Sequence, residues 1–223
     1  MRVAIHQPEF LPWLGFFDKM KRVDTYIILD NVQFSKNGFQ NRNRLVDSNG
    51  NVFWVTVPVK STGHTNKRIL DIKIENTQPW RRKLWGRIHS SYCRHPFFNS
   101  LGSELEAIIQ EPHSDLVGLN LEIIQFFRRC FDINVPIVQA SKLEIVGSRS
   151  ELLLAACMEV GATTYLSGPS GHNYLNTQMF LSAGIDVEFH EFTSPAQGKA
   201  QGFNVSSLDL LLNYGPSSRN FLA

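Results

Sequence analysis

Two short apolar segments that flank a helical segment constrain the fold of this chain more than any other feature. The apolar run that ends at Ile5 predicts a buried strand over residues 2–6, and a second strand is predicted over residues 25–30. Between them, residues 13–23 predict a short amphipathic helix. Its apolar residues recur at three-residue steps and its charged residues lie elsewhere on the helical wheel: Leu14, Phe17 and Met20 against Asp18, Lys19, Lys21 and Arg22. A strand, a helix and a strand in this order favour a right-handed crossover between parallel strands, which indicates an α/β sheet.

The rest of the chain predicts a mostly parallel sheet flanked by helices, with a helical insertion in the middle of the chain. Residues 79–132 form that helical layer, broken at His95-Pro96. Residues 31–49 are polar and predict a loop that leads into an Asn-Gly turn. Because no Pro/Gly/Ser linker or internal repeat is visible, residues 1–223 are expected to form a single α/β domain. The other predicted strands cover residues 52–58, 69–74, 135–139, 164–167 and 187–192, and the other predicted helices cover 149–160, with a capping box at Ser148 and Glu151, and 173–183.

Composition and charge exclude several classes of protein. The formal charge is only +2 in 223 residues, which is too weak to indicate binding to genomic nucleic acid or to acidic membranes. No run approaches the roughly 18 apolar residues of a membrane span, and the first residues lack the features of a secretory signal, so a cytoplasmic protein is expected. The histidines and cysteines show no metal-ligand spacing, and no metal site is predicted.

The loop after the first predicted strand carries the densest chemistry, with His6-Gln7-Pro8 followed by Pro12-Trp13. Ligands of open α/β sheets bind at the carboxyl ends of the strands, where His6 is predicted to lie. An imidazole there suits a general acid or base, or a donor to a phosphate. Gln7 and Trp13 are candidates for contact with a sugar or a base. The alternative is that His6 is a buried polar group that satisfies the end of the strand.

A second polar cluster follows the second predicted strand and is therefore expected beside the first loop. Arginine binds phosphate oxygens in a bidentate manner, and amides both donate and accept hydrogen bonds, so the cluster suits a sugar or a diphosphate. The alternative is a solvated loop, although Phe34 and Phe39 within it favour an anchored one. Asp30 is a candidate catalytic residue that orients His6 or the acceptor, and the candidate binding residues are Gln33, Lys36, Asn41, Arg42 and Asn43.

A third cluster, residues 167–173, lies between a predicted strand and a predicted helix. Backbone amides at such a junction bind anions, and the candidate substrate-binding residues here are Ser167, Gly168, Ser170, Gly171 and His172. The segment has neither the GxGxxG spacing of a dinucleotide site nor the lysine of a P-loop. An ordinary strand-to-helix turn is the alternative.

The sequence resembles the WbqC-like protein family through blocks that run in order along nearly the whole chain. The most specific blocks are His6-Gln7-Pro8 with Pro12-Trp13-Leu14-Gly15, and Leu29-Asp30-Asn31-Val32-Gln33-Phe34 with Asn41-Arg42-Asn43. The further blocks are Val55-Thr56-Val57-Pro58-Val59, Tyr165-Leu166-Ser167-Gly168 and Ser206-Ser207-Leu208-Asp209-Leu210-Leu211. The sequence departs from the family where Ala196, rather than an aromatic residue, precedes Gln197. Proteins of this family are associated with bacterial surface-polysaccharide and modified-sugar gene clusters, so the resemblance implies a nucleotide-linked sugar or a related glycoconjugate precursor as the substrate.

Three functions are compatible with these residues. The first is a small-group transferase that moves an acyl or aminoacyl group to a nucleotide-linked amino sugar, with His6 as the base and with Arg42 and the 167–171 loop on phosphates. The second is a nucleotide-dependent ligase or nucleotidyltransferase in which His6 stabilises the transferring phosphate, although the usual HxGH motif is absent. The third is a noncatalytic protein that binds sugar nucleotides. The expected partner is a nucleotide-linked sugar or a related small molecule. The first function would also need an acyl donor, and the second would need a nucleotide. The cofactor and the oligomeric state are left unassigned.

Overall fold

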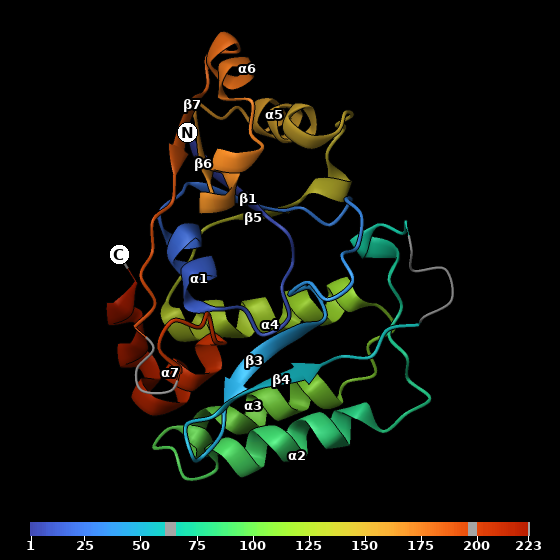
Figure 1. The fold of residues 1–223 in the computed structure, drawn as a ribbon, viewed down its shortest axis with the longest axis vertical. Helices are drawn as coiled ribbons and strands as arrows, with labels where there is room; N and C mark the ends of the chain where they lie inside the picture. Colours follow the sequence, from blue (N-terminus) through green and yellow to red (C-terminus); the bar gives the residue numbers. More distant parts are fainter. Residues whose placement is uncertain (61–65, 196–199, 223) are drawn as a thin grey trace.

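The computed structural model describes residues 1–60, 66–195 and 200–222, so Ala196 and Gln197 lie outside the described residues. Within these ranges a parallel sheet of five strands has helices on both of its faces, and an antiparallel hairpin lies at one end of the molecule (Figure 1). The strands of the sheet, in spatial order, are β5 (Ile137–Gln139), β2 (Thr25–Ile28), β1 (Arg2–His6), β6 (Thr164–Ser167) and β7 (Asp186–Phe189).

Alternate side chains of the central strands enter two hydrophobic cores on opposite faces of the sheet. Val3 and Ile5 of β1 pack with residues of α5 and α6, whereas Ala4 between them packs with residues of α1 and α4. Figure 1 shows α5 and α6 at one end of the molecule, with α1 and α4 on the other side of the sheet. The bounds of these helices are α1 (Leu14–Lys21), α4 (Leu116–Phe131), α5 (Arg149–Glu159) and α6 (Thr177–Ser182).

The other end of the molecule is formed by the hairpin and the remaining helices (Figure 1). The hairpin consists of β3 (Arg42–Val46) and β4 (Val52–Thr56), and its turn ends at Gly50, which has a φ of 77°. The remaining α-helices are α2 (Trp80–Tyr92), α3 (Phe98–Gln110) and α7 (Ser207–Tyr214), and short 3-10 helices cover Ile69–Asp71, Ala140–Lys142, Pro169–Asn173 and Gly215–Phe221. Helices α2, α3 and α4 occupy the segment in which a helical layer is predicted.

The predicted α/β class, with a parallel sheet and a helical layer in mid-chain, is confirmed. The capping box at Ser148 and Glu151 is present at the start of α5. The strand predicted over 69–74 is wrong: the segment starts with a 3-10 turn, in which Ile72 N–H donates to the Ile69 carbonyl at 3.1 Å. Ile69 and Ile72 are both buried, and their three-residue spacing fits that turn. The residues after the turn, Lys73 and Ile74, form only isolated bridges.

Several predicted strands are a few residues shorter in the structure, and two segments differ from the predictions by more than that. The polar loop predicted over 31–49 contains strand β3, because Arg42 and Arg44 lie on one face of the hairpin and Leu45 is buried on the other. The helix predicted over 173–183 is shortened to α6, because the chain first makes the 3-10 helix Pro169–Asn173.

Helix α1 is buried from Leu14 to Met20 and exposed only at its last residue, Lys21, contrary to the amphipathic helix expected from the sequence. Phe17 packs on Phe127 and Phe131 of α4, and Phe16 packs on Tyr26 of β2. Asp18 is 0% exposed and Lys19 is 2% exposed, although both were expected on a solvated face. Two charged side chains are therefore held inside the protein next to the end of the sheet.

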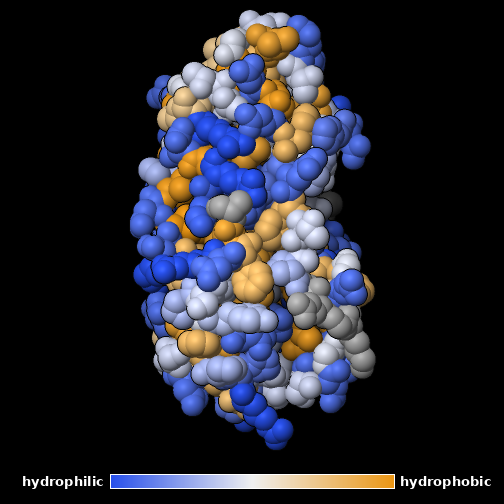
Figure 2. All heavy atoms as spheres, turned by 90° about the vertical axis from the view of Figure 1, so that its left-hand side faces the viewer, coloured by the Kyte–Doolittle hydropathy of each residue, from blue (hydrophilic) through white to orange (hydrophobic). Residues whose placement is uncertain are grey.

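The face of the molecule that lies on the left in Figure 1 is mostly hydrophilic, with hydrophobic residues in small groups between the polar ones (Figure 2). Scattered apolar atoms of this kind are normal on a protein surface. Within the described ranges, none of the helices combines the length and the hydrophobicity that crossing a membrane would require.

Candidate functional site

The sheet changes its direction of winding between β1 and β6. Strand β1 leads through α1 to β2 on one side, and β6 leads through α6 to β7 on the other. The two strands pair in parallel, with Ala4 opposite Leu166. Their carboxyl ends, at His6 and Ser167, therefore meet at the switch point of the sheet, which is where open α/β sheets bind ligands.

His6 presents a neutral imidazole at this point. Its Nδ1 lies 3.0 Å from the Gln7 carbonyl oxygen, and because a carbonyl only accepts, Nδ1 carries the hydrogen and Nε2 is an acceptor. The Nε2 atom faces Glu9 Oε1 at 3.8 Å, and 26% of the imidazole is exposed. Burial, together with the charge of Lys19, lowers the pKa of His6 to about 3.

Glu9 is a buried carboxyl group with an unused oxygen. The residue is 7% exposed, and its Oε2 has no hydrogen-bond partner among the described residues. Burial raises the pKa of Glu9 to about 8, and the charge of Lys19 opposes this rise. Glu9 therefore retains a proton near neutral pH and offers an unpartnered oxygen to a ligand.

Lys19 reaches the switch point from α1. Its Nζ donates to the Ile5 carbonyl oxygen at 3.2 Å. The same Nζ lies 3.9 Å from the position that a Cβ on Gly168 would occupy, so the ammonium group reaches from β1 to the end of β6. Burial lowers the pKa of Lys19 to about 7, and the Glu9 carboxylate opposes this fall.

A second buried pair lies at the end of β7. His190 Nε2 donates to Asp18 Oδ2 at 2.6 Å, and Arg22 Nε donates to the same oxygen at 2.7 Å. His190 is 4% exposed, and its backbone N–H donates to the Ser167 carbonyl at 2.8 Å. This backbone bond places His190 beside the carboxyl end of β6, at the same end of the sheet as His6.

The third predicted cluster is only partly brought to this site. Ser167 is buried, and its Oγ donates to the Gly168 carbonyl at 3.2 Å. Gly171 backs on Ser167 so closely that a Cβ there would overlap its hydroxyl. His172 stacks on Phe189, with ring centroids 3.5 Å apart, and both His172 and Ser170 are exposed.

Asp30 lies on the other side of β1, at the end of β2. Its carboxylate accepts from Gln139 Nε2 at 3.0 Å, from Ser141 N–H at 2.9 Å and from Ser141 Oγ at 2.7 Å. Since these donors belong to β5 and the turn after it, Asp30 ties β2 to β5. Its oxygens make these three bonds rather than a contact with His6.

The amides of the second cluster mostly support the backbone. Asn43 Nδ2 donates to the Phe10 and Leu11 carbonyls, at 3.1 and 2.9 Å, and Asn41 Nδ2 donates to the Val57 carbonyl at 2.9 Å. Further side-chain contacts join Gln40 Nε2 to Gln7 Oε1 at 2.6 Å, Gln33 Nε2 to Asn66 Oδ1 at 3.2 Å, and the rings of Trp13 and Phe192 at 5.7 Å between centroids.

The basic residues of the second cluster line a separate pocket of about 360 Å³. Arg42 Nε donates to the Asn37 carbonyl at 3.1 Å, and its guanidinium lies 4.2 Å from the centroid of a Trp54 ring. Lys36 is exposed at the same pocket. The Gln7–Gln40 bond links this pocket to the loop that holds His6, and the lining residues are Phe34, Lys36, Asn37, Asn41, Arg42, Thr56 and Val59.

The residues that sequence reasoning missed are Glu9, Lys19, Asp18 and His190. Glu9 carries a signal in the sequence, because it lies in the same proline-bounded loop as His6. Lys19 and Asp18 carry a weaker one: their helix also contains Phe16 and Phe17 on adjacent faces, which leaves little room for a solvated side. We find no local signal for His190.

Comparisons with known proteins agree with this arrangement along the chain. The family model described as the WbqC-like protein family matches residues 7–221. The uncharacterized protein Rv1507c of Mycobacterium tuberculosis is 31% identical over 226 residues, which cover 99% of this chain and 97% of that protein. No solved structure matches this chain.

Proposed function

This chain belongs to the WbqC-like protein family, and we propose that it is a small-group transferase that moves an acyl or aminoacyl group to a nucleotide-linked amino sugar in bacterial surface-polysaccharide or glycoconjugate biosynthesis. The observation that carries the proposal is the burial of two ionisable side chains at the switch point, together called the Glu9–Lys19 pair. Glu9 Oε1 lies 3.8 Å from His6 Nε2, and Lys19 Nζ donates to the Ile5 carbonyl in the strand that ends at His6. A lysine and a carboxyl group that are both neutral in part near pH 7 can exchange protons with a bound substrate.

The transfer step requires one proton to move from the acceptor to the leaving group. The sugar amine attacks the carbonyl carbon of an activated acyl donor, a new C–N bond forms, and the bond from that carbon to the leaving group breaks. His6 Nε2 accepts a hydrogen bond from the attacking amine and orients it. The Glu9–Lys19 pair takes up the amine proton and returns it to the leaving group, while Lys19 in its charged form stabilises the oxyanion.

His6 acts here as a neutral acceptor rather than as a strong base. An imidazole whose pKa is lowered to about 3 holds a proton weakly at neutral pH. The stronger bases of the site are Glu9 and Lys19, whose pKa values lie near 8 and 7. In this scheme Asp30 positions the strand ends that surround the substrate, through its bonds to Gln139 and Ser141.

The nucleotide part of the acceptor binds in the pocket of Lys36 and Arg42. Both side chains are cationic, and Arg42 is held in place by Trp54 and by the Asn37 carbonyl. A fixed guanidinium suits the oxygens of a diphosphate. The same pocket also supports the second candidate function, a nucleotide-dependent ligase, which differs in requiring ATP for turnover.

The test begins with the identity of the acceptor. Mass spectrometry of ligand that co-purifies with the protein names the nucleotide sugar, which is then incubated with acyl-thioester and aminoacyl donors, with and without ATP. We expect turnover without ATP, and we expect Lys19→Met to bind the acceptor but to lose roughly 10²–10⁴ in turnover. His6→Phe keeps a ring but has no acceptor for the attacking amine, and we expect it to lose about tenfold in turnover. Lys21→Gln, which changes an exposed lysine at the last residue of α1, is the control.

Four results would contradict the proposal. Turnover of His6→Phe at the wild-type rate would show that His6 Nε2 does not orient the attacking amine. Wild-type turnover by Lys19→Met would remove the buried pair from the reaction. Strict dependence on ATP would favour the ligase, and ligand binding without any turnover would favour a noncatalytic binding protein.

A further inference from the structure

Helix α2 lines a second concave surface, at the end of the molecule opposite α5 and α6 (Figure 1). A groove of about 540 Å³ is bordered by Pro79, Arg82, Lys83, Gly86 and Arg87. The helix carries no Asp or Glu between its first and last residues. The groove shares no lining residue with the pocket of Lys36 and Arg42 or with the switch point of the sheet.

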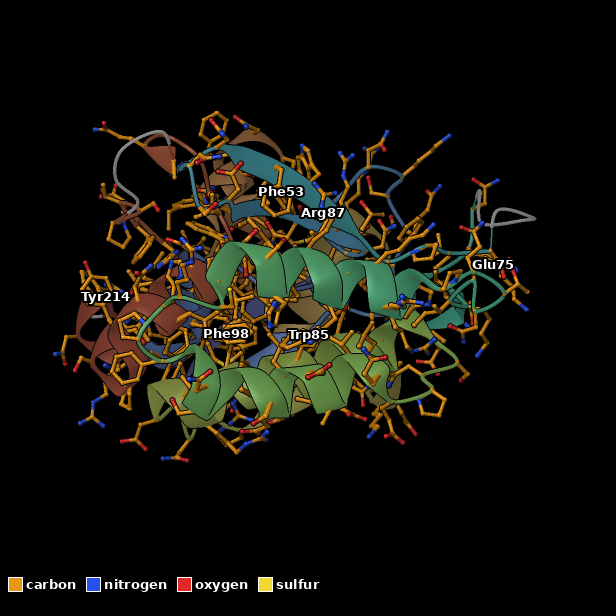
Figure 3. The ribbon with its side chains drawn as sticks, turned by 90° about the horizontal axis from the view of Figure 1, so that it is seen from below. Phe53, Glu75, Trp85, Arg87, Phe98 and Tyr214 are labelled. Atoms are coloured by element: carbon orange, nitrogen blue, oxygen red, sulfur yellow. The ribbon has the colours of Figure 1, made fainter. Side chains whose placement is uncertain are left out.

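The arginines of α2 divide into two groups by their contacts. Arg81 belongs to the fold, since it donates to Asn76 Oδ1 at 2.9 Å and to the Glu111 carbonyl at 3.1 Å. Arg87 is held beside the groove: its Nη1 donates to the Trp54 carbonyl at 3.2 Å, and its guanidinium lies 4.4 Å from the centroid of the Phe53 ring. Figure 3 shows Arg87 reaching from α2 toward Phe53 on the hairpin.

Arg82 and Lys83 contribute no contact that the fold needs. Both side chains are exposed, and neither has a hydrogen bond or an ion pair within the described part of the chain. Lys83 and Arg87 are four residues apart on one helix face, and like charges at this spacing destabilise a helix. The charges of Arg82 and Lys83 therefore add no contact that supports folding, and Lys83 lies close to the charge of Arg87.

Gly86 is the second feature that the fold does not explain. It lies in the middle of α2 and is exposed, and a Cβ at this position would have no atom within 4 Å. Alanine would fit without strain and would favour the helix. Glycine instead leaves bare backbone between Lys83 and Arg87, which opens the groove to close approach by a ligand.

We propose that this groove is a second binding site, one that takes the phosphate groups of an anionic ligand between Arg82, Lys83 and the fixed guanidinium of Arg87. Exposed like charges without partners and a glycine inside a helix both lower local stability. Proteins accept such costs chiefly at functional sites, which favours a binding role for this surface. The phosphates belong either to a soluble phosphorylated compound or to a lipid headgroup, and both sources share the same chemistry. Binding weakens as salt rises, because the site acts through exposed charges.

The experiment separates this groove from the pocket of Lys36 and Arg42 by using Arg42→Ala as the background. Inorganic pyrophosphate is titrated by calorimetry at two salt concentrations. Vesicles of phosphatidylglycerol and of phosphatidylcholine are tested for co-sedimentation. The first groove variant combines Arg82→Gln with Lys83→Gln and so removes two charges. The second, Gly86→Leu, fills the groove and keeps the charges. Lys21→Gln with Lys142→Gln removes two exposed charges elsewhere and is the matched control.

We expect both groove variants to bind about tenfold more weakly or worse, with melting temperatures that do not fall, and the control to bind like the background. Binding of pyrophosphate identifies a soluble ligand, and binding to phosphatidylglycerol vesicles without binding of pyrophosphate identifies a headgroup. The proposal is overturned if neither probe binds, if either groove variant binds as the background does, or if the control loses as much affinity. Loss in the charge variant alone indicates nonspecific attraction and also overturns it.

Discussion

Glu9→Gln tests whether the carboxyl group at the switch point is protonated in the folded protein. Burial raises the pKa of Glu9 from 4.5 to about 8. Because the folded state holds the proton that the unfolded chain releases, the stabilisation is complete below pH 4.5 and is lost as pH rises to about 8. At about 1.4 kcal/mol per pH unit, the full loss is on the order of 5 kcal/mol. Glutamine carries no such proton, so the variant is free of this loss.

Lys19 changes stability in the opposite direction in a higher pH range. Burial lowers its pKa from 10.5 to about 7, so the folded state gains stability as pH rises from about 7 to 10.5. In the wild-type protein, Lys19 therefore contributes little change in stability between pH 5 and pH 7. Glu9→Gln also removes the carboxylate that raises the pKa of Lys19. The pKa of Lys19 then falls further, so the gain in stability with pH that Lys19 causes begins at a lower pH. Both effects make the variant more stable, relative to wild type, as pH rises.

Urea unfolding at pH 5, 6 and 7 measures this difference. We expect the free energy of unfolding of Glu9→Gln, relative to wild type, to rise by about 2–3 kcal/mol between pH 5 and pH 7. Glu159→Gln, at an exposed position on α5, is the matched control and should show no such trend. The stability difference between Glu9→Gln and wild type could instead be the same at every pH. Glu9 would then ionise as it does in the unfolded chain, and its pKa would not be raised by burial.

Two further substitutions test the second polar cluster. Arg42→Ala removes a charge-assisted contact, and we expect it to weaken a phosphorylated ligand by about 2 kcal/mol in calorimetry while changing the melting temperature little; equal affinity would remove phosphate from the role of Arg42. Asn43→Ala leaves the Phe10 and Leu11 carbonyls without their shared donor. The free energy of unfolding in urea should therefore fall by about 2–3 kcal/mol, and a fall below about 0.5 kcal/mol would contradict the structural role of this buried amide.

The parts of the fold that follow from local signals could be predicted from the sequence. Strands β1 and β6 are short apolar runs, and the start of α5 is marked by Ser148 and Glu151. Strand β3 could not be found in this way, because the alternation of a strand is hidden when its buried face contains a polar residue. Asn43 is such a residue: it is 0% exposed and points its amide at the loop of Phe10.

The candidate site also contains residues that could be predicted from the sequence and residues that could not. His6 and Ser167 could be predicted to approach each other, because both end parallel strands and parallel strands end at one edge of a sheet. Lys19 and His190 could not, since their burial depends on how α1 packs between the sheet and α4. The pair of His190 and Asp18 joins residues 172 positions apart in sequence, a distance at which no pattern of neighbouring residues carries information.

The burial of Glu9 and Lys19 is itself an argument for chemistry at the switch point. A fold selected for stability alone would place apolar side chains at these positions, because removing two ionisable groups from water costs more than their mutual attraction returns. Arg22 and His190 show how this chain satisfies a buried carboxylate, since both donate to Asp18. Glu9 receives no such donor among the described residues, and its Oε2 is left without a partner. The protein therefore satisfies one buried acid fully and leaves another incomplete at the carboxyl edge of the sheet, where the proposed substrate would supply the missing hydrogen bond.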